Sequence, residues 1–524
     1  MTEPKLAAAE GAPESVPPPQ PWPARTAWLL RRHWLVSVLL AAGLVLRVLA
    51  KVAYSPALIY VDTLKYLYGV YPGSDPLGYR ALLKVVLPFG GLPIVAVLQS
   101  LIGLAVAVVL YVVLLRRGTV RWLAAVAVAP VLLDAYQLQM EQTIMPDVWF
   151  DALIVAGLAV LLWRPVVSVP YAVAAGLILG SSATFKAVGE VLVLPAVLFL
   201  LVSGGGWRRA VGHAAALAAA FAVPILAYCT FSYVDTGHFW LARSQSTSGR
   251  LAAAADCATL KLPADLRPLC PSPAVQAQGP DWLVHSSASP LHSAPIPPGT
   301  NRARLVGALN SAIEHQQPLR VVVSIAQDSL RLFAATRTPT PWISPISRWQ
   351  FQTGYPTYPH WVTLGQGNVI VVGLQRKAFG MFRFHPLSPA YGGPARVDRP
   401  IAEFLRSYQL NGGFTPGPLL LLFALAGLAG SVLTLIRRSG VARGTRSRQL
   451  GLGCLLFTAT AVVVLLVPDV LEFSWRYQLP ALITLPPAGV LGIGAFLASR
   501  QARREARGAG AAGSAPGPAA PGLG

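Results

Sequence analysis

Long apolar segments alternate with short polar segments along most of the chain. The apolar segments are rich in Leu, Val and Ala, and most approach the ~20 residues that a helix needs to cross a bilayer. They cover about residues 34–50, 92–115, 122–136, a stretch that follows 147 and ends at 163, 169–183, 191–202, 214–231, 416–436, 450–467 and a tenth stretch that ends near 500. This pattern predicts an all-α polytopic membrane protein with about ten transmembrane helices.

One arginine pair precedes the first apolar segment, and others follow alternate segments after it. They stand at Arg31-Arg32, Arg116-Arg117, Arg208-Arg209, Arg437-Arg438 and Arg503-Arg504. Because cations gather in the cytoplasmic loops of membrane proteins, we expect a multi-pass plasma-membrane protein with both termini in the cytoplasm. Lys and Arg outnumber Asp and Glu by 42 to 21. In a soluble protein this excess would suggest nucleic-acid binding, but its clustering between apolar segments indicates topology, and we expect no nucleic-acid partner.

Polarity divides the chain into five parts. Residues 1–30 and 501–524 are tails rich in Pro, Ala or Gly, which we expect to be disordered in the cytoplasm. Residues 31–232 form the first part of the membrane domain, with about seven spans, and residues 415–500 form the second part, with about three. Residues 233–414 lie between spans seven and eight and form an extracytoplasmic domain.

We expect the extracytoplasmic domain to be small and α-rich. Its first part, residues 244–298, is rich in Ser, Ala and Pro and predicts loops. Cys257 and Cys270 fall there, on the oxidising side, and we expect a disulfide, with two free thiols as the alternative. A short helix is expected over residues 401–410. Two apolar stripes at helical spacing precede it: Leu305, Leu309, Ala312 and Ile313, then Leu319, Val322, Val323, Ala326, Leu330 and Phe333.

Ionisable residues beside the spans converge on the outer side. Asp62, among tyrosines in the first outer loop, is the best candidate for a base that accepts a proton from a hydroxyl nucleophile. The alternative is that Asp62 caps a short helix that includes Lys65. Polar residues at the ends of spans are usually interface residues, but charges beside lipid are costly, so their convergence favours a functional site.

The other outer loops supply further candidates for substrate binding. Glu141 and Asp147 lie in a polar loop predicted over residues 137–147, where they either position a substrate or cap and solvate the loop. Lys186 and Arg476 are the best candidates for binding a phosphate, since Lys supplies a point charge and Arg a bidentate donor.

Three of these assignments have alternatives. Arg476 could instead pair with Glu472 or Asp469. Arg80 is a third candidate cation, and Tyr79 beside it contacts substrate or serves as an interface aromatic.

Several familiar motifs are absent from the sequence. There is no Walker loop, so we do not expect ATP to be a direct substrate. There is also no His/Cys cluster at zinc spacing and no Gly-x-Ser-x-Gly motif.

Three short stretches of the membrane part carry a resemblance to a known family. They are Tyr60-Val-Asp62, the run Thr184-Phe185-Lys186 followed by Leu194-Pro195, and Arg476-Tyr477-Gln-Leu-Pro480. Their positions and composition are similar to the first acidic motif, the Thr-Lys-Pro-like motif and the Arg-Tyr-x-Leu-Pro motif of the GT-C superfamily of polytopic glycosyltransferases. The likeness is strongest to bacterial members related to protein O-mannosyltransferases and lipid A aminoarabinose transferases.

The resemblance implies transfer of a sugar from a polyprenyl-phosphate donor, with inversion, to an envelope glycan, protein or lipid acceptor. Asp62 would be the base, and Lys186 and Arg476, with Arg80, would stabilise the leaving phosphate. Asp62 stands alone where the mannosyltransferases carry an Asp-Glu pair, so a requirement for Mg²⁺ or Mn²⁺ stays open.

Two other functions remain as alternatives. A cell-envelope glycan polymerase or ligase would depend on Arg and His of the outer region and would not need Asp62. A non-enzymatic transporter or flippase would be expected to show internal repeats or broken helices at mid-membrane, and the sequence shows neither clearly.

Overall fold

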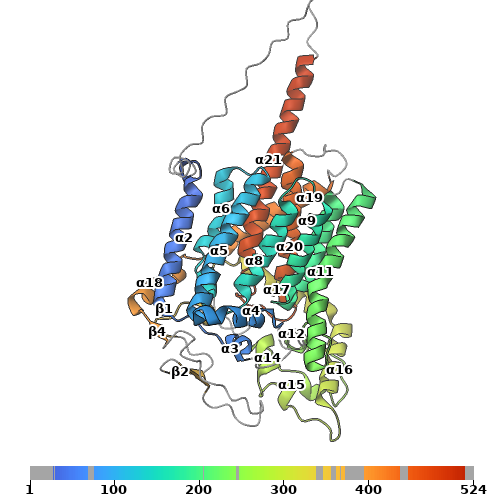
Figure 1. The fold of residues 1–524 in the computed structure, drawn as a ribbon. Helices are drawn as coiled ribbons and strands as arrows, with labels where there is room; N and C mark the ends of the chain where they lie inside the picture. The colour runs from blue at the N-terminus through green and yellow to red at the C-terminus, as the bar shows by residue number, and fades with distance from the viewer. Residues whose placement is uncertain are drawn as a thin grey trace, which may run out of the picture.

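A computed structural model describes residues 28, 30–68, 76–203, 206–242, 247–337, 346–355, 362–365, 368–371, 395–436 and 446–513. Most of these residues are helical, and the long helices lie side by side in one bundle (Figure 1). The short helices α3 (Val61–Tyr68) and α4 (Gly78–Val86) lie at one end of the bundle, opposite the end from which the last helix projects. The predicted helical class is therefore confirmed.

Within the described ranges, six helices are long and apolar enough to cross a membrane. They are α2 (Trp34–Ala53), α5 (Gly91–Arg116), α11 (Trp207–Thr236), α19 (Gly417–Ile436), α20 (Arg446–Asp469) and α21 (Ala481–Gly513). The bent pair α6 (Arg121–Leu133) and α7 (Ala135–Gln142) makes a seventh if it is one span. Shorter helices complete the bundle: α8 (Asp147–Leu162), α9 (Val169–Ala183), and α10 (Val193–Ser203) after the 3-10 turn η2 (Ala187–Leu192). A multi-pass membrane protein is confirmed, and ten spans remain a prediction.

Glycines let neighbouring helices of the bundle approach closely. Gly176 and Gly180 lie one turn apart on α9, facing α11. A Cβ at Gly176 would lie 2.4 Å from the carbonyl oxygen of Leu217, and one at Gly180 would lie 2.2 Å from that of Phe221. Such small-residue spacing is a common way for membrane helices to gain contact, because lipid supplies no hydrophobic drive for them to associate.

The predicted third span and the polar loop after it need correction. The helix breaks at Asp134, and the segment predicted as a loop over residues 137–147 begins as the helix α7. All eight residues of α7 are buried, and α6 and α7 meet at an angle of 50°. Asp134 is the N-cap of α7: its side chain accepts hydrogen bonds from the backbone N–H of Tyr136 at 2.9 Å and of Thr415 at 2.7 Å. An Asp that caps a new helix favours a break there.

Arg47 of α2 satisfies the polar groups that this break exposes. Its guanidinium donates to the carbonyl oxygens of Val131 and Leu132, at 3.1 and 3.0 Å, where α6 ends. It also pairs with the Glu141 carboxylate. Nη2 donates a hydrogen bond to Oε1 at 2.7 Å, and Nε lies 2.7 Å from Oε2 without forming a hydrogen bond. Both side chains are about 98% buried. A helix end inside a bundle needs donors for its last carbonyls, and Arg47 provides them.

Short elements connect α11 to α19 at the same end as α3 and α4 (Figure 1). They are α12 (Ser248–Ala254), η3 (Arg267–Leu269), α13 (Pro273–Gln276), α14 (Pro280–His285), α15 (Pro290–Ser293), α16 (Arg302–Gln316), α17 (Pro318–Leu330), η4 (Arg331–Phe333), η5 (Ile346–Trp349), β2 (Val362–Gly365), β3 (Asn368–Val371), β4 (Arg396–Val397) and α18 (Arg399–Leu410). Residues 244–298 therefore contain several short helices where the sequence predicted loops, because proline at the first turn starts each of α13, α14 and α15.

The structure of this region agrees with three of the sequence predictions and extends a fourth. Leu305, Leu309 and Ile313 are buried in a small core with α12 and α14. The expected disulfide joins Cys257 and Cys270, and the expected short helix is α18. Beyond the predicted α-rich content, β4 pairs antiparallel with β1 (Tyr54–Ser55), which follows α2, and β2 pairs with β3.

Removing one partner of the Arg47–Glu141 pair should destabilise the bundle. Glu141→Ala leaves Arg47 buried and uncompensated, which typically costs about 3–5 kcal/mol. Thermal unfolding of the detergent-solubilised protein should therefore show a clear loss of stability. The double variant Arg47→Met/Glu141→Met should lose less stability than the single variants Arg47→Met and Glu141→Met lose when their losses are added. Additive losses, or an unchanged unfolding temperature in Glu141→Ala, would contradict the assignment.

Candidate functional site

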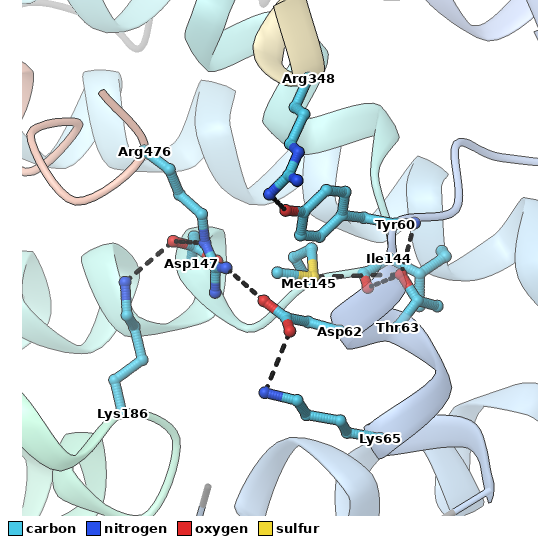
Figure 2. A network of polar contacts seen from close by, with 10 residues as sticks. All are labelled: Tyr60, Asp62, Thr63, Lys65, Ile144, Met145, Asp147, Lys186, Arg348 and Arg476. Carbon is cyan, nitrogen blue, oxygen red and sulfur yellow. Dashed lines mark hydrogen bonds and ion pairs between the residues drawn. The ribbon is translucent and has the colours of Figure 1, made fainter. Parts of the chain in front are cut away.

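The connection from α2 to α3 places Asp62 at the end of the bundle where α3 and α4 lie. Leu58 forms a parallel bridge with Thr143: its N–H donates to the carbonyl of Gln142 at 2.9 Å, and its carbonyl accepts from the N–H of Ile144 at 3.0 Å. The hydroxyl of Thr63 accepts a hydrogen bond from the N–H of Tyr60 and donates one to the carbonyl of Ile144, both at 3.0 Å. These bonds hold the start of α3 against the α7–α8 connection (Figure 2).

The same connection carries Asp147 to the site. Gln99 of α5 donates to the carbonyls of Glu141 and Thr143, at 2.8 and 2.7 Å, and its own side chain is fully buried. Pro146 precedes Asp147, which is the first residue of α8 and is 3% exposed. Two acidic side chains from separate loops, Asp62 and Asp147, are thus fixed beside one another by backbone hydrogen bonds.

Arg476 joins the two carboxylates. It lies in the loop between α20 and α21, and its Nη1 is 2.7 Å from Oδ2 of Asp62. Its Nε lies 3.1 and 3.2 Å from the two carboxylate oxygens of Asp147. In the part of the chain that the structure describes, Nη2 of Arg476 donates no hydrogen bond. Figure 2 shows Arg476 reaching from its own loop to both acids.

Two lysines complete an alternating chain of charges. Lys186 Nζ lies 2.9 Å from Oδ1 of Asp147, and Lys65 Nζ lies 3.0 Å from Oδ1 of Asp62. Because Lys186 and Arg476 both contact Oδ1 of Asp147, their nitrogens are at most about 6 Å apart. The network holds three positive and two negative charges, so it carries a net positive charge.

Aromatic rings surround the cations. The Lys186 ammonium lies 5.4 and 5.3 Å from the ring centres of Phe150 and Tyr477, and the Arg476 guanidinium lies 5.6 Å from that of Trp349. Rings at these distances attract cations and exclude water. The segment between α17 and α18 contributes Trp349 to this wall.

That segment also supplies Arg348, which donates to the hydroxyl of Tyr60 at 3.0 Å. Burial, with the nearby Asp62 carboxylate, raises the pKa of Tyr60 to about 12, so its hydroxyl stays protonated. Sequence reasoning did not assign Arg348, Trp349 or Lys65 to the site. The many aromatic residues around position 349 were the only sequence signal for this segment, and they did not indicate which residues it contacts.

The ion pairs determine the protonation of Asp62. Burial favours the neutral acid, but Lys65 and Arg476 outweigh it and lower the pKa of Asp62 to about 2. The two carboxylates in turn hold the pKa of Arg476 well above its usual value, despite burial. In this arrangement Asp62 is ionised at neutral pH but is a weak base.

The structure joins some predicted residues and separates others. Asp62, Asp147, Lys186 and Arg476 form one network, and the alternative pairing of Arg476 with Glu472 or Asp469 is wrong among the described contacts. Asp469 instead accepts hydrogen bonds from Gln478 and from Ser329 of α17. The alternative that Asp62 merely caps α3 accounts for its place in the first turn and its pair with Lys65, but not for its bond to Arg476.

Glu141, Tyr79 and Arg80 lie outside this network. Glu141 pairs with Arg47 as described above, so its contact with a substrate remains a prediction. Tyr79 is fully buried and donates to Oε1 of Gln99 at 2.9 Å, which makes the interface-aromatic alternative wrong. The Nε of Arg80, on α4, has no hydrogen-bond partner among the described residues, and its phosphate contact remains a prediction.

The donor set does not fit a divalent metal. The described residues contain no group of three or more His, Cys, Asp or Glu side chains that could hold a metal ion. Both carboxylates of the network are already bound by Arg and Lys side chains, which a metal would have to displace.

A second titratable group lies beside the network. Asp281 and His285 of α14 form an ion pair with a 3.0 Å distance between Oδ1 and Nδ1. Glu472, in the same loop as Arg476, interacts electrostatically with this pair and with Asp62. Burial and the Asp281 carboxylate raise the pKa of Glu472 to about 8, against the opposing effects of His285 and Arg476. The region between α11 and α19 thus brings charges to the edge of the membrane site.

Comparison with known proteins finds structural neighbours only. No family model and no curated protein matches the sequence. Solved structures that align with it include the Saccharomyces cerevisiae protein O-mannosyltransferase Pmt1-Pmt2 complex bound to the sugar donor, at 19% identity over 42% of this chain and 36% of that chain, with a TM-score of 0.31. The archaeal oligosaccharyltransferase AglB from Archaeoglobus fulgidus, in complex with an inhibitory peptide and a dolichol-phosphate, aligns at 14% identity over 94% and 53%, with a TM-score of 0.40.

ArnT from Cupriavidus metallidurans, bound to undecaprenyl phosphate, aligns at 15% identity over 90% of this chain and 78% of that chain, with a TM-score of 0.30. These neighbours are thus an O-mannosyltransferase complex, an oligosaccharyltransferase and ArnT. The chain spans about a third of the O-mannosyltransferase and about half of AglB. Because every TM-score is below 0.5, the function of this chain has to be argued from its own site.

The protonation of Glu472 predicts a pH dependence of stability. Its raised pKa means that the folded protein holds a proton that the unfolded chain releases between about pH 4.5 and pH 8, so stability falls as pH rises through that window. Thermal unfolding from pH 5.5 to 8.5 should show a shallower decline in Glu472→Gln than in the unchanged protein. The control is Glu403→Gln, which removes an exposed carboxylate. Equal slopes in the unchanged protein and Glu472→Gln would show that Glu472 does not hold this proton.

Proposed function

We propose that the protein is a membrane glycosyltransferase that moves a sugar from a polyprenyl-phosphate donor to an envelope acceptor on the outer face of the plasma membrane. The observation that carries the proposal is the sharing of Arg476 between Asp62 and Asp147, with Lys186 beside it. A paired Arg and Lys at the end of a membrane bundle suits a lipid-linked phosphate, because the lipid stays in the bilayer while the phosphate meets fixed donors.

The phosphate would bind by replacing carboxylates as the partner of the cations. Arg476 has its Nη2 available, and Lys186 uses one of its three N–H groups on Asp147. Both cations converge on one oxygen of Asp147, so a single phosphate that displaces this carboxylate can contact both. Charge that develops on the leaving phosphate is then stabilised by donors that are already in place.

The chemical step is a single displacement with inversion. The bond from the anomeric carbon to the phosphate oxygen breaks, and the electron pair leaves with the lipid phosphate. The acceptor oxygen forms the new bond to the same carbon, and its proton passes to the Asp62 carboxylate. Competition of the phosphate for Arg476 weakens the ion pair with Asp62 and raises its pKa from about 2, so Asp62 becomes a better base once donor is bound.

The remaining groups have supporting places. Asp147 positions the side chains of Lys186 and Arg476, and this positioning, rather than contact with the sugar, is its main role. The segments between α11 and α19 would bind the glycan, protein or lipid acceptor. Both termini of the chain would lie on the cytoplasmic side. Arg and Lys supply the positive charge in this proposal, so no step of it is assigned to Mg²⁺ or Mn²⁺.

Binding and transfer should separate in the variants of this network. Arg476→Met and Lys186→Met should each weaken binding of undecaprenyl phosphate to the solubilised protein by tenfold or more. Asp62→Asn should bind it at least as well, since one competing carboxylate is gone, yet should lose transfer from endogenous lipid donors by a factor on the order of 10²–10⁴. Titration of intrinsic tryptophan fluorescence measures binding, and incorporation of labelled sugar measures transfer.

The matched control is Arg399→Met, which removes an exposed Arg paired with Glu403. It should change neither measurement. Full transfer in Asp62→Asn would show that Asp62 is not the base, and unchanged binding in Arg476→Met would show that the network does not hold the phosphate.

One observation favours a second function, that of an envelope glycan polymerase or ligase. Such an enzyme would depend on Arg and His of the outer region, and the structure places Arg348 and the Asp281–His285 pair beside the network. His285→Asn and Arg348→Met decide between the two functions. In a glycosyltransferase of the proposed kind Asp62→Asn is the more damaging change, whereas a ligase would lose activity in His285→Asn and keep it in Asp62→Asn.

A further inference from the structure

Helix α17 has its polarity reversed relative to an ordinary surface helix. Its exposed side carries Leu319, Val322, Val323 and Leu330, which are 72%, 60%, 43% and 62% exposed, and Ala326, also exposed. At 3.6 residues per turn these five positions fall within an arc of about 100°. The sequence predicted this stripe, but the fold turns it outward instead of into a core.

The opposite side of α17 buries polar groups. Asp328 is 8% exposed and lies 2.5 Å from Nη1 of Arg250, a buried residue of α12. The same Nη1 is 3.2 Å from the hydroxyl of Ser324, and Ser329 donates to Oδ2 of Asp469 at 2.6 Å. A helix that buries its carboxylate in protein and exposes its aliphatic side chains has the polarity expected against lipid, not against water.

The exposed face continues the apolar surface of the membrane helices. Helix α17 packs on α20, and Leu466 and Val467, near the C-terminal end of α20, are exposed, as is Val470 just after it. The turn η4, which follows α17 directly, packs on α19. Arg320 is 57% exposed at the edge of the face, where a cation would meet lipid phosphates.

We propose that α17 lies in the outer leaflet, with the face formed by residues 319, 322, 323, 326 and 330 in contact with lipid acyl chains. The region between α11 and α19 is then partly embedded in the membrane rather than wholly above it. Because Ser329 binds Asp469 at the end of α20, this embedded helix is tied to the loop that carries Arg476. The inference does not depend on the proposed glycosyltransferase activity.

Spin labels on two sides of α17 test this placement. The native cysteines do not interfere, since Cys229 and Cys454 are buried and Cys257 and Cys270 form a disulfide. Val322→Cys places a label on the apolar face, and Gln327→Cys places one on the same helix about 140° away. The full chain is reconstituted in vesicles of phosphatidylethanolamine and phosphatidylglycerol, and the collision rates of each label with oxygen and with a water-soluble nickel chelate are compared.

The label at position 322 should collide at least threefold more with oxygen, relative to the nickel chelate, than the label at position 327. Equal, water-like collision rates at both positions would overturn the proposal. A label at 322 that is immobile and reached by neither reagent would also overturn it, since a protein partner or second copy would then cover the face. Ala326→Cys repeats the measurement on the same face, so that a poorly folded Val322→Cys protein does not decide the result.

Discussion

The guanidinium of Arg476 is the group on which the arrangement of the site depends. It is shared by Asp62 and Asp147, which come from segments far apart in the sequence, and it stands in a third segment of its own. Asp147 is 3% exposed, so without Arg476 it would depend on Lys186 alone. Charges in such surroundings interact more strongly than in water, and an unpaired one is costly. The ion pairs therefore fix α3, the start of α8 and the 470–480 loop relative to one another.

Polar side chains inside the bundle position the segment that carries Asp147 beside Arg476. Arg47 and Glu141 stabilise the break between α6 and α7, which lets the chain turn toward the α7–α8 connection inside the bundle. Gln99 then binds the carbonyls at the end of α7. Each contact satisfies a backbone group that neither lipid nor water could reach. The predicted site residue Glu141 thus acts, in this fold, as support for the segment that carries Asp147.

Much of the membrane part could be predicted from the sequence, because apolar length and cation spacing reflect the bilayer directly. The same signals placed Asp62, Asp147, Lys186 and Arg476 on one side. They could not show that these four residues touch, since that depends on the parallel bridge at Leu58 and the capping of α3 by Thr63. They also missed α7, because its polar side chains are typical of a loop. The structure shows that Arg47 pairs with the Glu141 side chain and that Gln99 binds the backbone carbonyls of Glu141 and Thr143. The interface-aromatic alternative for Tyr79 arose for a similar reason: its partner, Gln99, is 20 residues away in the sequence.

Pairing the charges internally also orders the proposed reaction. While Arg476 faces Asp62, the carboxylate has a pKa of about 2 and accepts a proton poorly, so the empty site has little power to activate water. An incoming phosphate competes for the same guanidinium, and the more Arg476 turns to it, the more basic Asp62 becomes. Basicity therefore develops only when a leaving group is in place to be stabilised. The exchange of one anion for another limits the gain in binding the donor, and leaves the larger gain for the transition state, where charge on the phosphate is greatest.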